Sequence, residues 1–362
     1  MSIFGLVAAA TPSPKVSPHI TPHPSPSPVS ARGVFDTFIG ALPHPWPPLW
    51  AVLVPLVLGV VVMPWFVGRL ARAGMGQKIR EEGPRAHMAK GGTPTSGGLG
   101  VIALILVGVL LMDRSATIVP VLVALALAGG FGLLDDLVTV KSRSWTRGLL
   151  ARQRIVMQFA VALVVAIVLL RSHADTQVIP LGGTWRMGWL LLPFATVGLA
   201  AAANAFNLTD GSDGLAPGVM LVVAVVIAML ARNHLHQVAL IRLMLITAGA
   251  LAAFLVYNTP PARVFLGGVG SEGLGMMLAA AAVSAGFLWF LPLIAIVPVL
   301  ETVSVIAQVS YFKRTGKRLL KMSPLHHHFQ LAGWGEWSVA LAGWTATLVA
   351  GSVSLLLVRR GV

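Results

Sequence analysis

Long apolar runs separated by short charged loops constrain the fold of this chain more than any other feature of its sequence. A segment needs about 20 mainly apolar residues to cross a bilayer. Such runs lie at about 49–70, 95–112, 116–134, 154–171, 187–208, 214–231, 239–257 and 338–358. Between Glu272 and Lys313 there are 40 more residues whose only charge is Glu301, and we expect two helices there, hinged near residues 284–287. The sequence therefore predicts an all-α polytopic integral membrane protein with about ten transmembrane helices.

The composition excludes several other classes of protein. Only 10% of the residues are charged and 56% are hydrophobic, whereas a soluble domain has about 25% charged residues. The net charge of +14 is spread thinly and has no aromatic-rich basic face beside it, so we expect no nucleic-acid partner. Because the chain has no cysteine, disulfides, thiolate metal sites and a catalytic thiol are excluded.

The chain divides into two parts of different composition. Residues 11–30 are rich in Pro, Ser and Thr, a composition that cannot bury a core. We therefore expect a disordered N-terminal extension over residues 1–48 and a ten-helix membrane domain over residues 49–362.

The basic residues predict the orientation of the helices. Of the 26 lysines and arginines, 16 lie in four loops, at 71–94, 135–154, 258–272 and 311–337. The richer side is expected to be cytoplasmic, which puts both termini outside. Nine of the twelve acidic residues lie on the same side. Acids contribute little to topology, so we interpret their clustering as a functional site that faces the cytoplasm.

Two motifs on this side suggest phosphate and metal binding. The loop GPRAHMAKGGTPTSGG contains Lys90 and Thr95, and glycine-rich backbone beside a lysine is typical of phosphate-binding loops; the alternative is a flexible loop that leads into a helix. Asp135 and Asp136 end the third apolar run. Paired carboxylates at a membrane boundary suit Mg²⁺, although a solvated helix end is the alternative.

A third motif, NAFNLTDGSDGLAPG, places Asn204, Asn207, Asp210 and Asp213 three residues apart. On a helical turn this spacing groups them on one side, where amides and carboxylates could contact a base or sugar and support a metal. The alternative for Asp213 is an N-cap of the following helix.

Two further motifs lie nearer the C-terminus. VFLGGVGSEGLG contains Phe265, which could stack on a nucleobase or simply pack, together with Glu272. The second motif contains the three consecutive histidines His326, His327 and His328. These cannot all point at one metal from regular structure, so phosphate binding or proton transfer is the better interpretation. The basic stretch before them is also typical of a face that binds anionic lipid.

In their order and spacing these motifs resemble those of the phospho-N-acetylmuramoyl-pentapeptide transferase family, the MraY translocases, within the polyprenyl-phosphate sugar-1-phosphate transferases. The resemblance runs from about residue 49 to the C-terminus. It implies a ten-helix bacterial inner-membrane enzyme, generally a homodimer, that uses Mg²⁺ at a cytoplasmic active site. The implied reaction transfers phospho-MurNAc-pentapeptide from UDP-MurNAc-pentapeptide to undecaprenyl phosphate and gives lipid I and UMP, the first membrane step of peptidoglycan synthesis.

The resemblance also implies roles for individual residues. Asp135 and Asp136 match the paired catalytic aspartates, and His326 matches the first histidine of the triplet. The substrate-binding positions that it implies are Lys90, Thr95, Asn204, Asn207, Asp210, Asp213, Phe265, His327 and His328, with Asp213 near the uracil and Phe265 stacked on it. Our own hypothesis for the metal ligands is Asp136 and Asp210.

One departure from the family pattern concerns the metal. The family loop has an aspartate ligand where this chain has Gly268, and Glu272, four residues further on, is the candidate substitute. A lysine that usually follows the aspartate pair is replaced by Thr139. One alternative is therefore an impaired relative that binds nucleotide sugar without turnover. A related GlcNAc-1-phosphate transferase is a second alternative, and a transporter is a third, because intramembrane acids and glycine-broken segments also mark substrate paths.

Overall fold

The computed structural model describes residues 49–76, 91–112, 115–141, 150–234 and 237–361. Eight helices within these residues are long and apolar enough to cross a membrane. Many of their large apolar side chains, among them Val61, Leu110 and Leu356, are exposed, as expected for surfaces that face lipid. The prediction of an all-α polytopic membrane protein is confirmed.

The elements are, in chain order, α2 (Trp50–Arg72), α4 (Gly98–Met112), η1 (Ala116–Ile118), α5 (Val119–Lys141), α6 (Ala151–Arg171), β1 (Thr176–Val178), β2 (Thr184–Arg186), η2 (Gly188–Leu190), α7 (Leu191–Thr209), α8 (Leu215–His234), α9 (Val238–Asn258), α10 (Gly267–Ser284), η3 (Leu288–Phe290), α11 (Leu291–Ile294), α12 (Ile296–Thr315), α13 (Leu325–Leu331) and α14 (Glu336–Gly361). The strands β1 and β2 pair antiparallel in a hairpin.

The long stretch with one charge is broken where its length requires a hinge. Helix α10 ends at Ser284, and Gly286 follows in the left-handed region with φ +82°, which a glycine adopts without steric cost. The chain then turns through η3 and α11 before α12 begins at Ile296. The shorter apolar helix α4 and the glycine-rich α10 accompany the eight candidate spans, and the predicted number of ten crossings and the side of the termini stay predictions.

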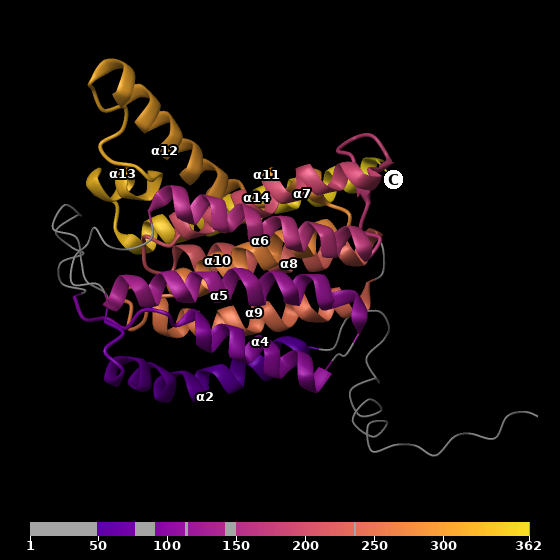
Figure 1. Ribbon diagram of the computed structural model, residues 1–362. Helices are drawn as coiled ribbons and strands as arrows, with labels where there is room; N and C mark the ends of the chain where they lie inside the picture. Colours follow the sequence, from indigo (N-terminus) through magenta and orange to yellow (C-terminus); the bar gives the residue numbers. More distant parts are fainter. Residues whose placement is uncertain (1–48, 77–90, 113–114, 142–149, 235–236, 362) are drawn as a thin grey trace, which may run out of the picture. The chain divides into compact units, whose positions relative to one another are not determined.

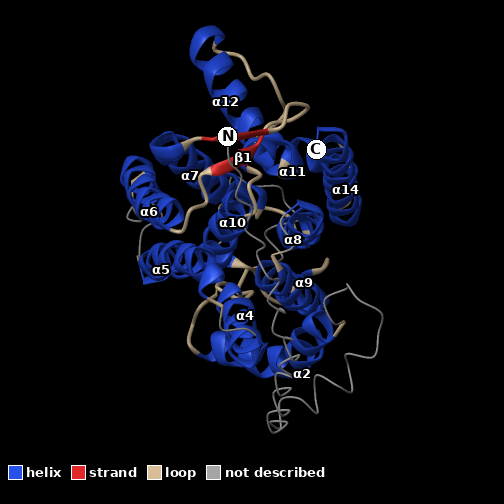
Figure 2. Cartoon of the chain, turned by 90° about the vertical axis from the view of Figure 1, so that its right-hand side faces the viewer, coloured by secondary structure: helices blue, strands red, loops and turns tan. Residues whose placement is uncertain are grey.

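Helix α10 lies at the centre of the bundle and is surrounded by α4 to α9 (Figure 2). Its glycines allow this close packing. A Cβ added to Gly132 of α5 would overlap the backbone of Gly268, and one added to Gly273 would lie 2.8 Å from the Cα of Gly129. Small residues let membrane helices approach at backbone distance, so the glycine content of α10 is explained by its central position.

Helices α12 and α13 form a separate arm at one end of the bundle (Figure 1). Helix α12 extends away from the other helices and ends at Thr315, and the following Gly316 has φ +68°. Helix α13 lies beside it, at the opposite end of the bundle from the C-terminus (Figure 1). This arm carries the three consecutive histidines.

Candidate functional site

The carboxylate of Asp136, near the end of α5, binds the first turn of α10. Its Oδ1 accepts a hydrogen bond from the backbone N–H of Gly268 at 2.9 Å, and its Oδ2 accepts one from Val269 at 3.3 Å. The hydroxyl of Ser96 donates to Oδ2 at 2.7 Å. The N-cap residue of α10, Leu266, offers no side-chain acceptor, so the free N–H groups that begin this helix are satisfied from α5.

The loop that contains Thr95 is held beside α10 by backbone hydrogen bonds. Phe265 donates to the carbonyl of Pro94 at 2.8 Å, and Gly97 donates back to the carbonyl of Phe265 at 2.8 Å. A third bond joins Gly98 to Leu266 at 2.9 Å. The predicted phosphate-binding loop and the predicted base-stacking loop are thus brought together in one place.

Ser96 and Thr95, in the predicted phosphate-binding loop, are both buried. Ser96 is fully buried with φ +64°, an uncommon conformation for a residue with a side chain, and its hydroxyl contacts Asp136. Thr95 is buried beside it. Lys90 lies outside the described residues.

Asp135 is linked to Glu272 of α10 through a shared arginine. Arg154 of α6 places Nη2 3.2 Å from Oδ2 of Asp135 and 3.0 Å from Oε1 of Glu272. The guanidinium therefore stands between two carboxylates from different helices, and α5, α6 and α10 are held together at this point.

Glu272 has no exposed surface, and its partners come from two further positions. Gln158 of α6 donates to Oε2 at 3.0 Å, and Asn207 of α7 donates to Oε1 at 2.6 Å. With Arg154, three side chains donate to this carboxylate. A buried charge is tolerated when it is paired and hydrogen-bonded in this way.

Asp210 follows α7 and lies close to the same helix end. Burial of its carboxyl raises the pKa of Asp210 well above the usual range, and the negative charges of Asp136 and Asp213 raise it further; a hydrogen bond from the backbone N–H of Gly267 acts in the opposite direction. A cation between Asp136 and Asp210 would remove this repulsion.

The predicted single-face grouping of the third motif is wrong in part. Asn204 and Asn207 lie in α7, but the helix ends at Thr209, so Asp210 and Asp213 lie in the turn before α8. The polar and glycine residues after Thr209 favour a turn over a continued helix. The spacing of three therefore does not reflect one helical face.

The N-cap hypothesis for Asp213 also needs correction. Gly214, rather than Asp213, directly precedes α8, and Oδ2 of Asp213 accepts a hydrogen bond from the backbone of Ala262 at 2.9 Å. Asn258 accepts from the N–H of Gly214 at 3.0 Å and donates to the carbonyl of Val264 at 2.8 Å. This turn is therefore fastened to the loop that carries Phe265.

His326 is buried on α13 and approaches the same turn. Its Nδ1 lies 3.2 Å from Oε2 of Glu301 without the alignment of a hydrogen bond, and its Nε2 has no hydrogen-bond partner among the described residues. A Cβ added to Gly211 would overlap Nε2, so the ring lies directly against the turn. Buried polar atoms are normally paired, and Nε2, which has no partner among the described residues, indicates a place for a ligand.

The other two histidines make contacts within and below α13. Nδ1 of His327 lies 3.0 Å from Oε1 of Gln330, and Nδ1 of His328 accepts from the backbone of Lys321 at 3.1 Å. Gln330 also donates to the hydroxyl of Ser212 at 3.0 Å. The three histidines therefore occupy different environments, and only His326 is fully buried.

Five residues of this region were not predicted from the sequence: Ser96, Arg154, Gln158, Asn258 and Gln330. Ser96 lies in the predicted phosphate-binding loop, directly after Thr95, so its hydroxyl could have been included among the candidate site residues. Each of the others has a partner far along the chain, such as Glu272 for Arg154 and Gln158, Gly214 for Asn258 and Ser212 for Gln330, and no local pattern indicates these pairings.

Similarity to known proteins agrees with this architecture. Residues 118–286 match the family model of glycosyl transferase family 4. A phospho-N-acetylmuramoyl-pentapeptide-transferase of Halalkalibacterium halodurans is 39% identical over 317 residues, which cover 85% of this chain and 97% of the relative. Proteins of the same name from Clostridioides difficile and Bacillus pumilus are 35% and 38% identical, over 85% and 83% of this chain and 97% and 94% of theirs.

The fold and the acidic site at one end of it, together with the family model, define a multi-pass membrane glycosyl-phosphate transferase. Within that class, the chain belongs to the phospho-N-acetylmuramoyl-pentapeptide transferase family, whose members match it over most of its length. The resemblance seen in the sequence motifs is confirmed.

Proposed function

We propose that the chain transfers phospho-MurNAc-pentapeptide from UDP-MurNAc-pentapeptide to undecaprenyl phosphate, giving lipid I and UMP. The observation that carries this proposal is the convergence of motifs from five parts of the chain on the first turn of α10. Asp136 and Asp210 accept hydrogen bonds from the backbone of Gly268 and Gly267. Phe265 and the loop that contains Thr95 are joined beside this turn, and His326 lies against Gly211, the residue after Asp210.

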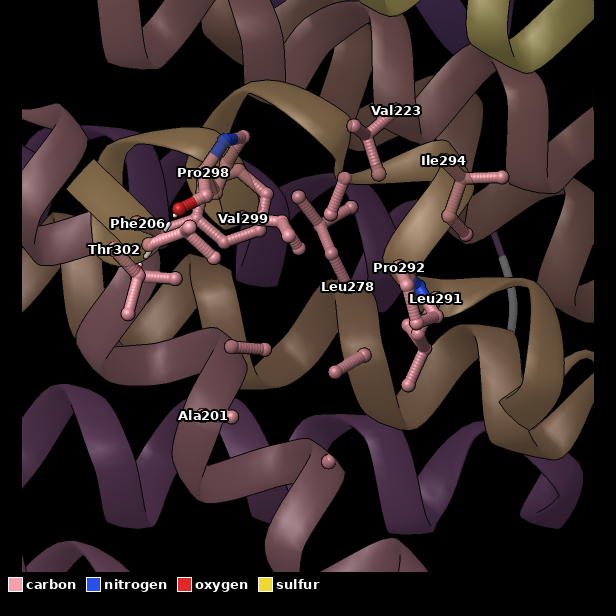
Figure 3. Close-up of a pocket in the computed structure, with 16 residues that line it drawn as sticks. Ala201, Phe206, Val223, Leu278, Leu291, Pro292, Ile294, Pro298, Val299 and Thr302 are labelled. Atoms are coloured by element: carbon pink, nitrogen blue, oxygen red, sulfur yellow. Dashed lines mark hydrogen bonds between the residues drawn. The ribbon is translucent and has the colours of Figure 1, made fainter. Parts of the chain in front are cut away.

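An apolar cavity supports a lipid substrate. A cavity of about 250 Å³ lies among α7, α8, α10, α11 and α12, and side chains such as Phe206, Leu278, Pro298 and Val299 line it (Figure 3). Thr302 is the only hydroxyl-bearing residue of its lining. Phe206, which lines the cavity, directly precedes Asn207 in α7. We propose that a prenyl chain bound in this cavity directs its phosphate toward the polar residues.

The carboxylates fit a Mg²⁺ site in their chemistry. Magnesium is usually held by one or two carboxylates, with water and phosphate oxygens as its other ligands. Asp136 and Asp210 face one helix end and repel one another, so we assign both as ligands. Among the described residues no group of three metal-binding side chains forms. Glu272 is not included, because the guanidinium of Arg154 already pairs with its carboxylate at 3.0 Å.

When bound, Mg²⁺ would neutralise the charge that develops on the departing UMP. The protein's own residues position the reactants. Asp135, held by Arg154, accepts the proton of the lipid phosphate when that phosphate is protonated. Since the second pKa of a phosphate is about 6, most of this nucleophile is already charged, and positioning contributes most of the rate. His326 supplies ring nitrogens for the pyrophosphate.

Phe265, Asp213 and Asn204 form the nucleotide side of the proposal, with Phe265 stacked on uracil. Thr95 and Lys90 are assigned to the phosphates, and His327 and His328 to the outer edge of the substrate. The loops rich in lysine and arginine support a cytoplasmic active site in the bacterial inner membrane, with both termini outside. A homodimer is proposed by family resemblance, and residues 1–48 are proposed as an extension outside the catalytic domain.

Release of UMP tests the proposal directly. Purified full-length protein, UDP-MurNAc-pentapeptide, undecaprenyl phosphate and Mg²⁺ should give UMP and lipid I, and omission of the lipid phosphate should prevent it. UDP-GlcNAc serves as the control donor. Turnover of UDP-GlcNAc alone would indicate a GlcNAc-1-phosphate transferase, and nucleotide binding without any turnover would indicate an impaired relative.

A further inference from the structure

Glu272 is the most deeply buried acid among the described residues, and no role in the proposed reaction accounts for it. Its relative exposure is 0%, although it lies in a central helix of a membrane protein. Burying an ionisable side chain within a membrane costs free energy, and such residues usually have a functional role. Its partners identify that role, because two of them stand in the proposed site.

The first partner is Asn207, whose orientation Glu272 determines. A carboxylate can only accept hydrogen bonds, so the NH₂ group of Asn207 must face Oε1 of Glu272 at 2.6 Å. The other end of the amide, Oδ1, has no hydrogen-bond partner among the described residues. Asn207 is thereby presented to a ligand as an acceptor, and it selects a group that donates, such as a sugar hydroxyl or an imide N–H.

The second partner is Arg154, which Glu272 holds against Asp135. One guanidinium nitrogen, Nη2, makes both contacts, and 34% of the side chain is exposed. The remaining donors have no partner in the part of the chain that the structure describes. Guanidinium groups bind phosphate oxygens in a fixed, forked geometry, so these donors suit an anionic acceptor.

We propose that Glu272 is a positioning residue that orients Asn207 as an acceptor and holds Arg154 as a donor, so that together they bind a sugar phosphate. The inference rests on the proposed function, since it concerns the same substrate. It accounts for an acid one helical turn beyond Gly268 without making that acid a metal ligand.

The hydrogen-bond geometry allows an exchange that keeps every contact. Arg154 and Asn207 both donate to Oε1 of Glu272, while Gln158 donates to Oε2. In the double variant E272Q/Q158E, the new carboxylate at 158 accepts from the NH₂ of Gln at 272. The oxygen of that amide then faces Arg154 and Asn207, as Oε1 does in the wild type.

Three variants of the full-length protein in lipid nanodiscs test the proposal. E272L removes the acceptor, and the exchange E272Q/Q158E preserves it. Q158L is the matched control, because among the described residues the side chain of Gln158 hydrogen-bonds only to Glu272. The measurements are the Kd of UMP by calorimetry, the KM for UDP-MurNAc-pentapeptide, and the Mg²⁺ concentration at half-maximal activity.

We expect E272L to raise both the KM for UDP-MurNAc-pentapeptide and the Kd of UMP about tenfold or more, which corresponds to the loss of roughly one well-placed hydrogen bond. The exchange and Q158L should stay within about threefold of the wild type in KM, Kd and Mg²⁺ midpoint. Q158L should still lower the thermal midpoint. If E272L does not fold, the exchange alone decides the matter.

Several results would overturn the proposal. An unchanged KM in folded E272L removes the positioning role, and a KM in Q158L as high as in E272L makes the network purely structural. A large rise of the Mg²⁺ midpoint in the exchange makes Glu272 a metal ligand. A wild type that binds UMP but releases none overturns the proposed function, while the Kd values still test Glu272; a wild type that does neither overturns both.

Discussion

Glu272 and Glu301 are both buried carboxylates in membrane helices, but they hold their neighbours in different ways. Glu272, in central α10, accepts hydrogen bonds from Arg154, Gln158 and Asn207 on two other helices. Glu301, in the outlying α12, is 4% exposed, and among the described residues its carboxylate contacts one residue, His326. The backbone N–H of His326 lies 3.2 Å from each oxygen of Glu301.

Glu272 therefore joins several helices of the bundle, whereas Glu301 attaches one short helix to α12. Loss of Glu272 leaves unsatisfied groups on α6 and α7 and weakens the junction of several helices. Loss of Glu301 frees one end of α13, a helix of seven residues. We therefore expect the first change to affect stability and function together, and the second to affect mainly the placement of His326.

The largest effect is expected for Glu272→Leu. Gln158 and Asn207 lose their acceptor and Arg154 loses one of two carboxylates, so the free energy of unfolding should fall by about 3 kcal/mol or more. Reversible unfolding in mixed micelles measures this. If Glu272→Leu lowers the free energy of unfolding less than Glu301→Leu does, Glu272 does not contribute more to the packing of the bundle than Glu301.

Glu301→Leu should cost less stability but most of the activity. One buried N–H is left without its acceptor, which corresponds to about 1–3 kcal/mol, and the ring of His326 loses its charged neighbour. We expect UMP release to fall at least about tenfold, while the Kd of UMP changes little. Glu301→Gln retains an acceptor for the backbone N–H and serves as the control, with an intermediate rate.

Gly268→Asp tests the proposed metal site at the start of α10. A Cβ at this position would lie 2.9 Å from Oδ1 of Asp136 and 3.2 Å from the carbonyl oxygen of Gly132. Crowding of this kind costs about 1–3 kcal/mol, and two carboxylates would then face each other. We predict a lower thermal midpoint without Mg²⁺ and a larger rise on its addition than in the wild type.

Two controls accompany this variant. Gly268→Ala carries the crowding without the charge, and it should lose stability without gaining sensitivity to Mg²⁺. If Gly268→Asp alone releases UMP and the wild type does not, the wild-type chain is inactive as written. An unchanged response to Mg²⁺ in Gly268→Asp would remove Asp136 from the proposed metal site.

The smallest effect is expected for Gln330→Ala. It removes one hydrogen bond between α13 and the turn at Ser212, worth about 0.5–1.5 kcal/mol. Thermal unfolding should change slightly, and the KM for the nucleotide sugar should rise by a small factor. Ser212→Ala removes the same hydrogen bond but keeps the contact between Gln330 and His327, and its effect should be no larger.

Much of this architecture could be predicted from the sequence. Helix lengths follow from the bilayer thickness, and the hinge between α10 and α12 follows from a run too long for one helix. The limits appear where partners are distant. Glu272 lies more than 100 residues from Arg154 and Gln158, and apolar helices carry no pattern that indicates which neighbours they meet.

Local spacing also misled where it competed with turn chemistry. The four polar residues from Asn204 to Asp213 are each three positions apart, which matches a helix. The turn after Thr209, however, separates the two asparagines from the two aspartates. Glu272 illustrates the same limit for function. Its position four residues after Gly268 suggested a metal ligand, and only the three-dimensional contacts supplied the alternative of an anchor for Asn207 and Arg154.

The central position of α10 also has a consequence for the synthesis of the protein. A helix with a glutamate and five glycines among its first nine residues is a poor candidate for entry into the bilayer by itself, because an acidic group inside a membrane segment is unfavourable. The partners of Glu272 lie in α6 and α7, earlier in the chain. These helices therefore leave the ribosome before α10. When α10 enters the membrane, the hydrogen-bond donors to Glu272 have already been synthesised.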